Sequence, residues 1–216
     1  MNVIELFSSI DGEGKRQGFL TTFLRLHDCN IRCSYCDTLY SYGPESTFES
    51  MSVQAVADAI EQLENHRITV TGGEPLLQEL AIIELIDELT RRNARYDFNI
   101  ETNGTIIPSF HRDNVWFTYD YKTPSSLAED AMNLDIFKVA TPADIIKFVV
   151  GSMQDLDRMD EILKTYPTDA QIFVSPVWGN IEGATIIEYM KAHNWQNVRF
   201  QLQIHKFIWD PDAKGV

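Results

Sequence analysis

Short runs of β-branched and aromatic residues recur along the chain, and such runs are typical of strands. They cover residues 21–27, 67–70, 97–100, 115–121, 145–150, 171–177 and 198–204. The segments between most of them are long enough for helices. An alternation of strand and helix predicts parallel strands, arranged as a barrel or as an open α/β sheet. Because no linker, repeat or low-complexity tract interrupts the pattern, we expect residues 1–216 to form a single domain.

Two of the intervening segments have a clear helical periodicity. The first follows Ser52, a candidate N-cap. Its apolar stripe consists of Val53, Val56, Ala57, Ile60 and Leu63. The second stripe consists of Leu80, Ile83, Ile86 and Leu89, and it ends in Arg91 and Arg92, where cations are favourable at a helix C-terminus. Two weaker helices are expected near residues 155–165 and 182–193.

Five polar or glycine-rich motifs lie at the ends of predicted strands or directly after them. They are TGGEP (71–75), ETNG (101–104), DYK (120–122), SPVW (175–178) and the pair His205-Lys206. The carboxyl ends of parallel strands form the working face of α/β folds. We therefore expect these five motifs to line one pocket.

The composition is that of a globular protein with a substantial core, since 44% of the residues are hydrophobic and 23% are charged. The formal net charge of −14 disfavours nucleic acid or an anionic membrane as the partner, because both attract clustered basic residues. We expect no secretory signal, since the first residues carry no basic segment followed by an apolar run. No stretch approaches the roughly 20 apolar residues of a membrane span, so we expect a cytoplasmic protein.

All three cysteines of the chain lie in the ten residues CNIRCSYCDT (29–38). Their C-x3-C-x2-C spacing is too local for a disulfide framework and indicates metal binding or catalysis in a reducing compartment. Three thiolates suit an iron–sulfur cube with one open iron. Zinc normally takes four ligands, and the fourth would have to be His27 or Asp37, both of which crowd the loop. The third interpretation is that the thiols are buried and inert.

The cysteine spacing, with Tyr35 one position before Cys36, resembles the signature of the radical S-adenosylmethionine (SAM) superfamily. The resemblance implies that the open iron of a [4Fe-4S] cluster chelates SAM, and that reduction cleaves SAM to a 5′-deoxyadenosyl radical. Segments similar to Gly72-Gly73-Glu74 bind the SAM ammonium through backbone carbonyls and the Glu. Glycine permits close backbone approach, so we expect a side chain at Gly73 to block SAM and leave the iron content intact.

The opening SSIDGEGKRQGFLTTFLRLHDCNIRCSYCDT resembles the 7-carboxy-7-deazaguanine synthase family. TGGEPLLQ, ETNGT, DYKTPSS, IIKFVV, SPVWG and LQIHKFIW extend the resemblance over nearly the whole chain. It implies an abbreviated, partial TIM-like barrel of parallel strands with few helices, which associates as a homodimer. It also implies conversion of 6-carboxy-5,6,7,8-tetrahydropterin to 7-carboxy-7-deazaguanine with loss of ammonia, on the route to queuosine. SAM, Mg²⁺ and an electron donor such as a flavodoxin would take part.

The resemblance assigns residues of this chain to three sets, and none is given a catalytic role because the radical would be generated on SAM. Metal ligands would be Cys29, Cys33 and Cys36 for the cluster and Thr38 for Mg²⁺. The SAM set comprises Tyr35, Gly72, Gly73, Glu74, Asp120, Tyr121, Lys122, Ser175, Pro176, Val177 and Trp178. The pterin set comprises Ile10, Asp11, Gly12, Glu13, Arg25, Thr71 and His205.

These assignments are chemically reasonable, but several residues also have ordinary interpretations. Glu13 can accept the paired donors of an aminopyrimidinone, and Arg25 can hold a carboxylate with its fork. A single hydroxyl, that of Thr38, is enough for Mg²⁺, which keeps several waters. Alternatively, Arg25 is an ion-pairing strand residue, Thr38 a capping hydroxyl and His205 a structural histidine.

Two features depart from the family pattern or extend beyond it. Asp11 stands where the family has Gln, which puts side-chain recognition there in question. The tail 209–216 extends past the last motif, and its Pro211 and mixed charges indicate a loop. An acidic electron donor would need a local basic patch, for which Lys15, Arg16 and Arg32 are candidates.

Two rival functions fit the cysteine loop. An enzyme that installs a glycyl radical on a partner protein also uses C-x3-C-x2-C, but this chain shows no added segment to build a groove for that partner. A non-enzymatic protein could use the loop as a structural staple, but it would leave the motifs at 72–75, 101–104 and 120–122 unexplained.

Overall fold

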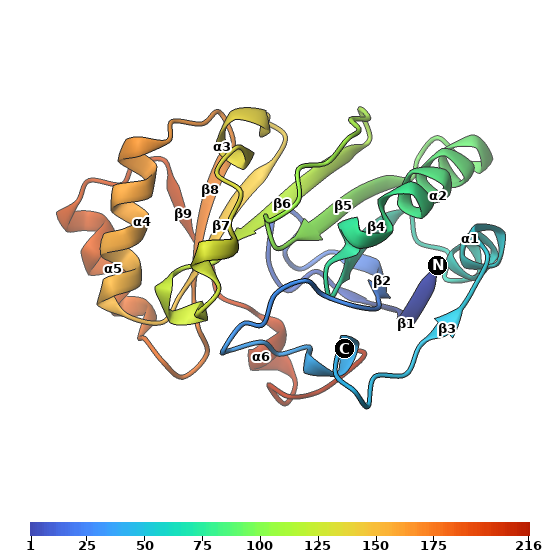
Figure 1. The fold of residues 1–216 in the computed structure, drawn as a ribbon, viewed down its shortest axis with the longest axis horizontal. Coiled ribbons are helices and arrows are strands. Elements are labelled where there is room, and N and C mark those ends of the chain that lie inside the picture. The colour runs from blue at the N-terminus through green and yellow to red at the C-terminus, as the bar shows by residue number, and fades with distance from the viewer.

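The computed structural model describes residues 1–216 and contains one nine-stranded sheet flanked by helices (Figure 1). The strands are β1 (Asn2–Ile10), β2 (Leu20–Leu26), β3 (Glu49–Ser50), β4 (Arg67–Gly72), β5 (Asp97–Thr102), β6 (Val115–Tyr121), β7 (Ile145–Val150), β8 (Gln171–Pro176) and β9 (Val198–Phe200). The α-helices are α1 (Val53–Gln62), α2 (Glu79–Arg92), α3 (Ile136–Val139), α4 (Met153–Thr165), α5 (Gly183–Ala192) and α6 (His205–Ile208). Short 3-10 helices are η1 (Leu39–Ser41), η2 (Pro75–Gln78), η3 (Pro124–Ser126) and η4 (Glu129–Ala131).

The sheet is an open, partial barrel. Its strand order is β3-β1-β2-β4-β5-β6-β7-β8-β9, and each neighbouring pair from β2 to β9 is parallel. The two end strands, β3 and β9, do not pair with each other. The predicted α/β fold, an abbreviated barrel with few helices, is therefore confirmed.

The first strand, β1, lies outside the predicted runs. It pairs antiparallel with β2 and with β3, so this edge of the sheet does not follow the strand–helix alternation. Polar residues such as Glu5, Ser8 and Ser9 interrupt its apolar ones, and the strand is only partly buried. A partly buried antiparallel strand of this kind lacks the continuous apolar run by which buried parallel strands are found.

The last strand is shorter than predicted. The run 198–204 predicts seven extended residues, whereas β9 ends at Phe200 and His205 begins α6. The backbone of the intervening residues bonds elsewhere, since the Ile204 N–H donates to the Gly12 carbonyl at 3.0 Å. His205 and Lys206 therefore do not end a strand, although both still line the cavity described below.

Four of the helices, α1, α2, α4 and α5, occupy the predicted segments. In α1 the Ser52 hydroxyl accepts a hydrogen bond from the Ala55 N–H at 3.1 Å, as expected of an N-cap. The predicted stripe of α2 is partly wrong, because Leu80 is 77% exposed whereas Ile82 and Leu85 are fully buried. The helices cover the outer face of the sheet, α1 and α2 near one end and α4 and α5 near the other (Figure 1).

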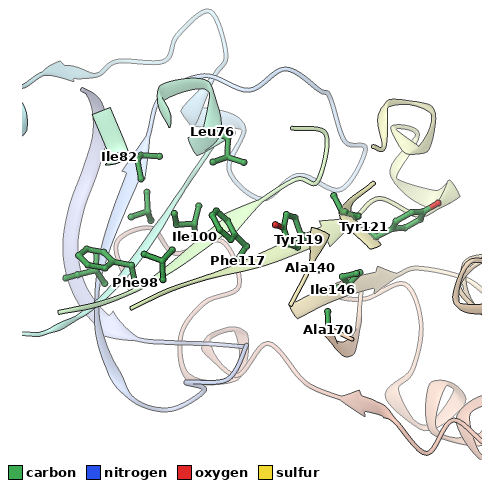
Figure 2. Packing of buried hydrophobic residues seen from close by; sticks show 14 of the residues in the cluster. Leu76, Ile82, Phe98, Ile100, Phe117, Tyr119, Tyr121, Ala140, Ile146 and Ala170 are labelled. Atoms are coloured by element: carbon green, nitrogen blue, oxygen red, sulfur yellow. The ribbon is translucent and has the colours of Figure 1, made fainter. Parts of the chain in front are cut away.

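The main hydrophobic core lies between the sheet and these helices (Figure 2). Alternate residues of β6 supply it: Val115, Phe117, Tyr119 and Tyr121 are all buried there. Successive side chains of a strand point to opposite faces, so Thr118 and Asp120 face the inside of the barrel. None of the helices has the length and apolar character needed to cross a membrane.

A loop at residues 11–18 spans the gap between the two ends of the sheet. The side-chain amide of Gln201 bonds to both the N–H and the carbonyl of Gly14, each at 2.9 Å. The Gln17 side chain donates to the carbonyls of Gly12 at 3.0 Å and Leu202 at 2.6 Å. These bonds attach the start of the chain to its end, and they place the loop at the amino ends of the parallel strands, since Ile10 pairs with the first residue of β2.

Candidate active site

A cavity of about 270 Å³ lies at the carboxyl ends of the strands. Each of the five predicted motifs contributes to its lining. The lining residues from the motifs are Thr71, Gly72, Gly73, Glu101, Thr102, Asn103, Asp120, Lys122, Val177, Trp178, His205 and Lys206. The three cysteines and the loop containing Glu13 line the same cavity. The expectation of one shared pocket is confirmed.

The cysteine loop begins directly after β2 with a left-handed residue, Asp28 (φ 80°). The Asp28 carboxylate accepts a hydrogen bond from the Cys29 N–H at 2.8 Å, and the Asp28 carbonyl accepts one from the Glu74 N–H at 2.7 Å. The Arg32 guanidinium donates to the carbonyls of Cys29 and Ile31 at 2.7 Å each. These backbone bonds hold the loop in shape without using any thiol.

The three thiols are free, partly buried and open to the cavity. Burial raises the pKa of the Cys29 thiol and raises that of Cys33 to about 11, so a metal must displace a proton from each to bind it as thiolate. No three Cys, His, Asp or Glu side chains converge as ligands of a single metal ion. A four-iron cluster does not require such convergence, because each thiolate binds a different iron. Three free thiols at one cavity are the donor set that a four-iron cluster with one open iron would use.

Gly73 lines the cavity and also packs against the backbone of the cysteine loop. A Cβ on Gly73 would overlap the carbonyl oxygen of Asp28, the residue that precedes Cys29. The backbone of Asp28 cannot move aside as the end of a flexible side chain can. The expectation that a side chain at Gly73 would leave the iron content intact is therefore revised, because the loop itself requires a glycine at this position.

Glu74, assigned to the SAM set, is fully buried and does not line the cavity. Its carboxylate accepts hydrogen bonds from the Leu76 N–H at 2.9 Å, the Thr102 hydroxyl at 2.9 Å and the Asn103 N–H at 2.7 Å. Burial raises the pKa of Glu74, against the lowering effect of these donors. The side chain joins the ends of β4 and β5 and positions Asn103, whose amide lies 3.7 Å from the Cys29 sulfur.

The rest of the SAM set divides in the same way. Tyr35, Gly72, Gly73, Asp120, Lys122, Val177 and Trp178 line the cavity, whereas Glu74, Tyr121, Ser175 and Pro176 do not. Tyr121 follows Asp120 on β6 and so faces the outer core, where its hydroxyl donates to Glu129 at 2.9 Å. Ser175 is buried and its hydroxyl has no partner. The side chains of consecutive strand residues point to opposite faces, so they cannot all contact one ligand. A sequence motif does not show which of its residues face that ligand.

All seven residues of the pterin set line the cavity. The imidazole of His205 packs directly on Gly12, where a Cβ would overlap the ring. Burial lowers the pKa of His205, which favours its neutral form at pH 7. Residues from opposite ends of the chain are thus in contact at the cavity.

Asp11, the residue that departs from the family's Gln, has a structural role here. Its carboxylate accepts hydrogen bonds from Arg16 Nε at 3.0 Å, Thr21 at 2.9 Å and Thr69 at 3.1 Å. Arg16 is only 7% exposed and stacks on Trp116. Arg16 is therefore not part of a surface patch for an electron donor, and that prediction is wrong for this residue.

Arg25 lines the cavity and also forms the ion pair that its ordinary interpretation predicts. Its Nε lies 2.6 Å from Glu5 of β1, the residue opposite it in the antiparallel pair. The Tyr40 hydroxyl donates to the same Glu5 oxygen at 2.7 Å. Glu5 binds the Nε side of the Arg25 guanidinium. This orientation requires β1, the strand that the sequence pattern missed.

Two charged residues that the family resemblance placed in none of its three sets, Lys147 and Glu101, complete the cavity. Lys147 Nζ lies 2.6 Å from Glu13 and 3.6 Å from Asp120, and Lys122 Nζ lies 3.0 Å from Asp120. Burial raises the pKa of Glu101 to about 7, while Lys147 opposes that rise. Burial alone would raise the pKa of Asp120, but the two lysines lower it. A lysine within the apolar run IIKFVV was the available signal, because a charge in a buried strand needs a partner.

The tail reaches the cavity. Residues 210–216 all line it, without regular secondary structure, and the Lys214 ammonium lies 4.2 Å from the centre of the Tyr40 ring. The tail therefore covers one side of the site beside Arg25 and the cysteine loop, and it is the loop that Pro211 indicated.

The chain is similar to known proteins over its full length. A family model described as the Radical SAM superfamily matches residues 25–133. The 7-carboxy-7-deazaguanine synthase of Clostridium acetobutylicum is 37% identical, over 99% of this chain and 98% of the relative. The chain belongs to the 7-carboxy-7-deazaguanine synthase family. The synthase of Methanospirillum hungatei is also 37% identical, over 98% of this chain and 86% of the relative.

A solved structure supports the fold. The crystal structure of QueE from Escherichia coli superposes with a TM-score of 0.70 at 24% sequence identity, covering 93% of this chain and 92% of that one. Membership of the 7-carboxy-7-deazaguanine synthase family confirms the predicted radical SAM enzyme, and the family implies a [4Fe-4S] cluster and SAM. The glycyl-radical alternative is not favoured by these relatives.

Proposed function

We propose that the chain converts 6-carboxy-5,6,7,8-tetrahydropterin to 7-carboxy-7-deazaguanine and ammonia, in deazapurine biosynthesis. One observation carries this proposal beyond the family name: the three cysteines and all seven residues of the pterin set line one cavity. A glycyl-radical activating enzyme would need a groove open to a protein loop, whereas the tail 210–216 covers part of this cavity. The cavity suits a small molecule.

The residues present fit the cluster and SAM. Three half-buried thiols without a fourth ligand leave one iron open, and the Gly72-Gly73 backbone lies beside them at the cavity. When bound, the cluster supplies the electron that cleaves SAM reductively. We assign the SAM contacts to Tyr35, the glycines, Asp120, Lys122, Val177 and Trp178, and we assign a supporting role to Glu74, Tyr121, Ser175 and Pro176.

The substrate residues bind, orient and exchange protons. Glu13 has one buried carboxylate oxygen, Oε2, without a partner, and it can accept the donors of the aminopyrimidinone edge. Arg25 faces the cavity with the part of its fork that Glu5 does not hold, and it can pair with the substrate carboxylate. Glu101, with a pKa of about 7, can both take and give a proton at neutral pH, as release of ammonia requires.

We also assign the Mg²⁺ ligand to Thr38. Thr38 precedes η1, yet its side chain makes no capping hydrogen bond, and its hydroxyl interacts with the Cys36 sulfur instead. It lies 3.6 Å from the Cys36 sulfur and lines the cavity.

A magnesium titration tests this assignment. Thr38→Ala should keep its iron and its SAM cleavage without substrate, yet lose most of its response to Mg²⁺ and form product on the order of 10²-fold more slowly, because a misplaced substrate reacts poorly. Thr38→Ser, which keeps the oxygen, should be milder. A wild-type magnesium response in Thr38→Ala would place the ion elsewhere.

The remaining assignments concern the assembly. We propose that residues 1–216 act as a single radical SAM domain in a homodimer, for which exposed apolar side chains such as Phe207 and Ile208 offer contact surface. We place the protein in the reducing cytoplasm, where thiols remain free, with a flavodoxin-like electron donor. Arg32 on the cysteine loop is exposed and is the remaining basic candidate beside the cluster for docking that donor.

Dependence of SAM cleavage on the pterin tests the proposed function. With reductant present, addition of the carboxytetrahydropterin should raise 5′-deoxyadenosine formation by the reconstituted protein. Cys33→Ala should form none, whereas Ser46→Ala, a change outside the cavity, should behave as wild type. Cleavage that ignores the pterin would refute the substrate assignment.

A further inference from the structure

Lys147 is a buried cation whose side chain enters the cavity from β7. Only 6% of that side chain is exposed, and its ammonium lies 2.6 Å from Glu13 Oε1 and 3.6 Å from Asp120 Oδ2. A buried charge is unfavourable unless it is paired, so these three groups stabilise one another. Burial alone would lower the pKa of Lys147, but the carboxylates of Glu13, Asp120 and Glu101 raise it well above its ordinary value. Lys147 therefore stays charged.

The carboxylates held by Lys147 each have a second oxygen without a partner. Glu13 Oε2 and Asp120 Oδ1 are buried and accept no hydrogen bond, although both residues line the cavity. A buried oxygen left without a donor is unfavourable, and such atoms in native structures need an explanation. A ligand that donates hydrogen bonds in the cavity provides one. Lys147 binds the opposite oxygen of Glu13 and so leaves Oε2 for that ligand.

We propose that Lys147 determines substrate specificity: it holds one carboxylate oxygen of Glu13, so that the other accepts the 2-amino and ring N–H groups of the pterin. This inference rests on the proposed function, because it takes the aminopyrimidinone edge as the group that Glu13 meets. Lys147 acts through Glu13 and is a positioning residue.

The need for Lys147 follows from the charges around Glu13. Asp120 and Glu101 line the same cavity, and their like charges repel the Glu13 carboxylate unless a cation holds it in place. Lys122 does not replace Lys147, because its ammonium pairs with Asp120 at 3.0 Å and no contact joins it to Glu13. Without Lys147, the site loses the acceptor pattern that distinguishes a 2-amino from a 2-oxo ring.

Two unreactive analogues that differ at this position test the inference. The dissociation constants of 6-carboxypterin, with a 2-amino group, and 6-carboxylumazine, with a 2-oxo group, are measured on the reconstituted, SAM-bound protein. Wild type should prefer the pterin by at least about tenfold, since a mismatched edge leaves buried polar groups unpaired. Lys147→Met should reduce that preference to less than about threefold, mainly through weaker binding of the pterin.

Three further variants make the result interpretable. Glu13→Gln should also lose the preference, whereas Lys138→Met, which removes a lysine that is 75% exposed, should keep it. Lys147→Gln is the second test variant in case Lys147→Met does not fold, because its amide is polar and uncharged but is one atom too short to take the place of the ammonium at Glu13. It should lose the preference as well. Iron content should match wild type in each variant, because none of the replaced side chains belongs to the cysteine loop.

The possible outcomes separate this inference from the proposed function. Equal weakening of both analogues, with the wild-type preference retained in Lys147→Met and Lys147→Gln, would show a purely structural lysine and overturn the inference. Product formation by wild type in that case would leave the proposed function standing. A wild type that neither prefers the pterin nor forms product would overturn both.

Discussion

Gly73 and Glu74 lie where the end of β4 meets the cysteine loop, and they show how far single residues could be interpreted from the sequence. Cys29 and Gly73 could be placed at the end of a predicted strand from their residue types, whereas Glu13 was placed at the same cavity only through the family resemblance. Their partners were not apparent, since Asp28 reaches Gly73, and Thr102 reaches Glu74, only in the folded chain.

The close approach of Gly73 to Asp28 predicts the effect of Gly73→Ala. The added Cβ must displace the backbone that precedes Cys29, so iron bound after reconstitution should fall below half of the wild-type content. Gly151→Ala is the matched control, because a Cβ there meets side-chain atoms at 3.4 Å, an ordinary contact distance. The measurement is iron per chain. Wild-type iron in Gly73→Ala would mean that the loop tolerates the shift.

Glu101 predicts a pH dependence of stability. Burial raises its pKa from an ordinary value of 4.5 to about 7, so between these values the folded protein binds more protons than the unfolded chain. Stability attributable to Glu101 is therefore present below about pH 4.5 and is lost as the pH rises through about 7. Removing this group should stabilise the protein at pH 8 relative to pH 5, by on the order of 2 kcal/mol.

The comparison uses Glu101→Gln, with Glu84→Gln on the exposed face of α2 as its control. Thermal unfolding midpoints of each variant and of wild type are measured anaerobically at pH 5 and pH 8. The unfolding midpoint of Glu101→Gln, relative to that of wild type, should be several degrees higher at pH 8 than at pH 5, at roughly 2–4 °C per kcal/mol. The relative midpoint of Glu84→Gln should be the same at both pH values. A constant difference at both pH values would show that Glu101 does not titrate in this window.

At the scale of elements, helices and parallel strands were predictable because their periodicity comes from local chain geometry. The antiparallel strand β1 and the exact face of α2 were not, since both depend on what packs against them. The predicted stripe of α2 began at Leu80, but the buried face runs through Ile82, Leu85, Ile86 and Leu89. Spacings of three and four residues fit both choices over a short window, and only the contact with the sheet decides between them.

A pair of substitutions checks the face of α2. Ile82→Ala removes a fully buried side chain and should cost about 2–5 kcal/mol of unfolding free energy. Leu80→Ala removes a side chain that is 77% exposed and should change stability by less than about 0.5 kcal/mol. The two costs are compared by denaturant unfolding under identical conditions. Equal losses of stability in the two variants would support the helix face predicted from the sequence, which includes Leu80.

At the scale of the whole molecule, the open sheet becomes an enclosed site because its two ends are joined by contacts distant in sequence. Gln201 bonds to Gly14, His205 packs on Gly12, and the tail lies across the opening. DGEG and His205 could be assigned to one site only through the family resemblance. No local sequence pattern predicts a contact such as that between Gly14 and Gln201, which are 187 positions apart. The joined ends bring Glu13 to Lys147, and this contact completes the substrate half of the cavity.

The mass of the product is the most direct test of the proposed conversion of 6-carboxy-5,6,7,8-tetrahydropterin to 7-carboxy-7-deazaguanine. The reconstituted protein is incubated anaerobically with 6-carboxy-5,6,7,8-tetrahydropterin, SAM, Mg²⁺ and reductant, and the products are identified by mass spectrometry. We expect 7-carboxy-7-deazaguanine and ammonia in equal amounts, with less than one SAM consumed per product. Recovery of unchanged pterin, from a protein that holds its cluster and cleaves SAM, would contradict the proposed conversion.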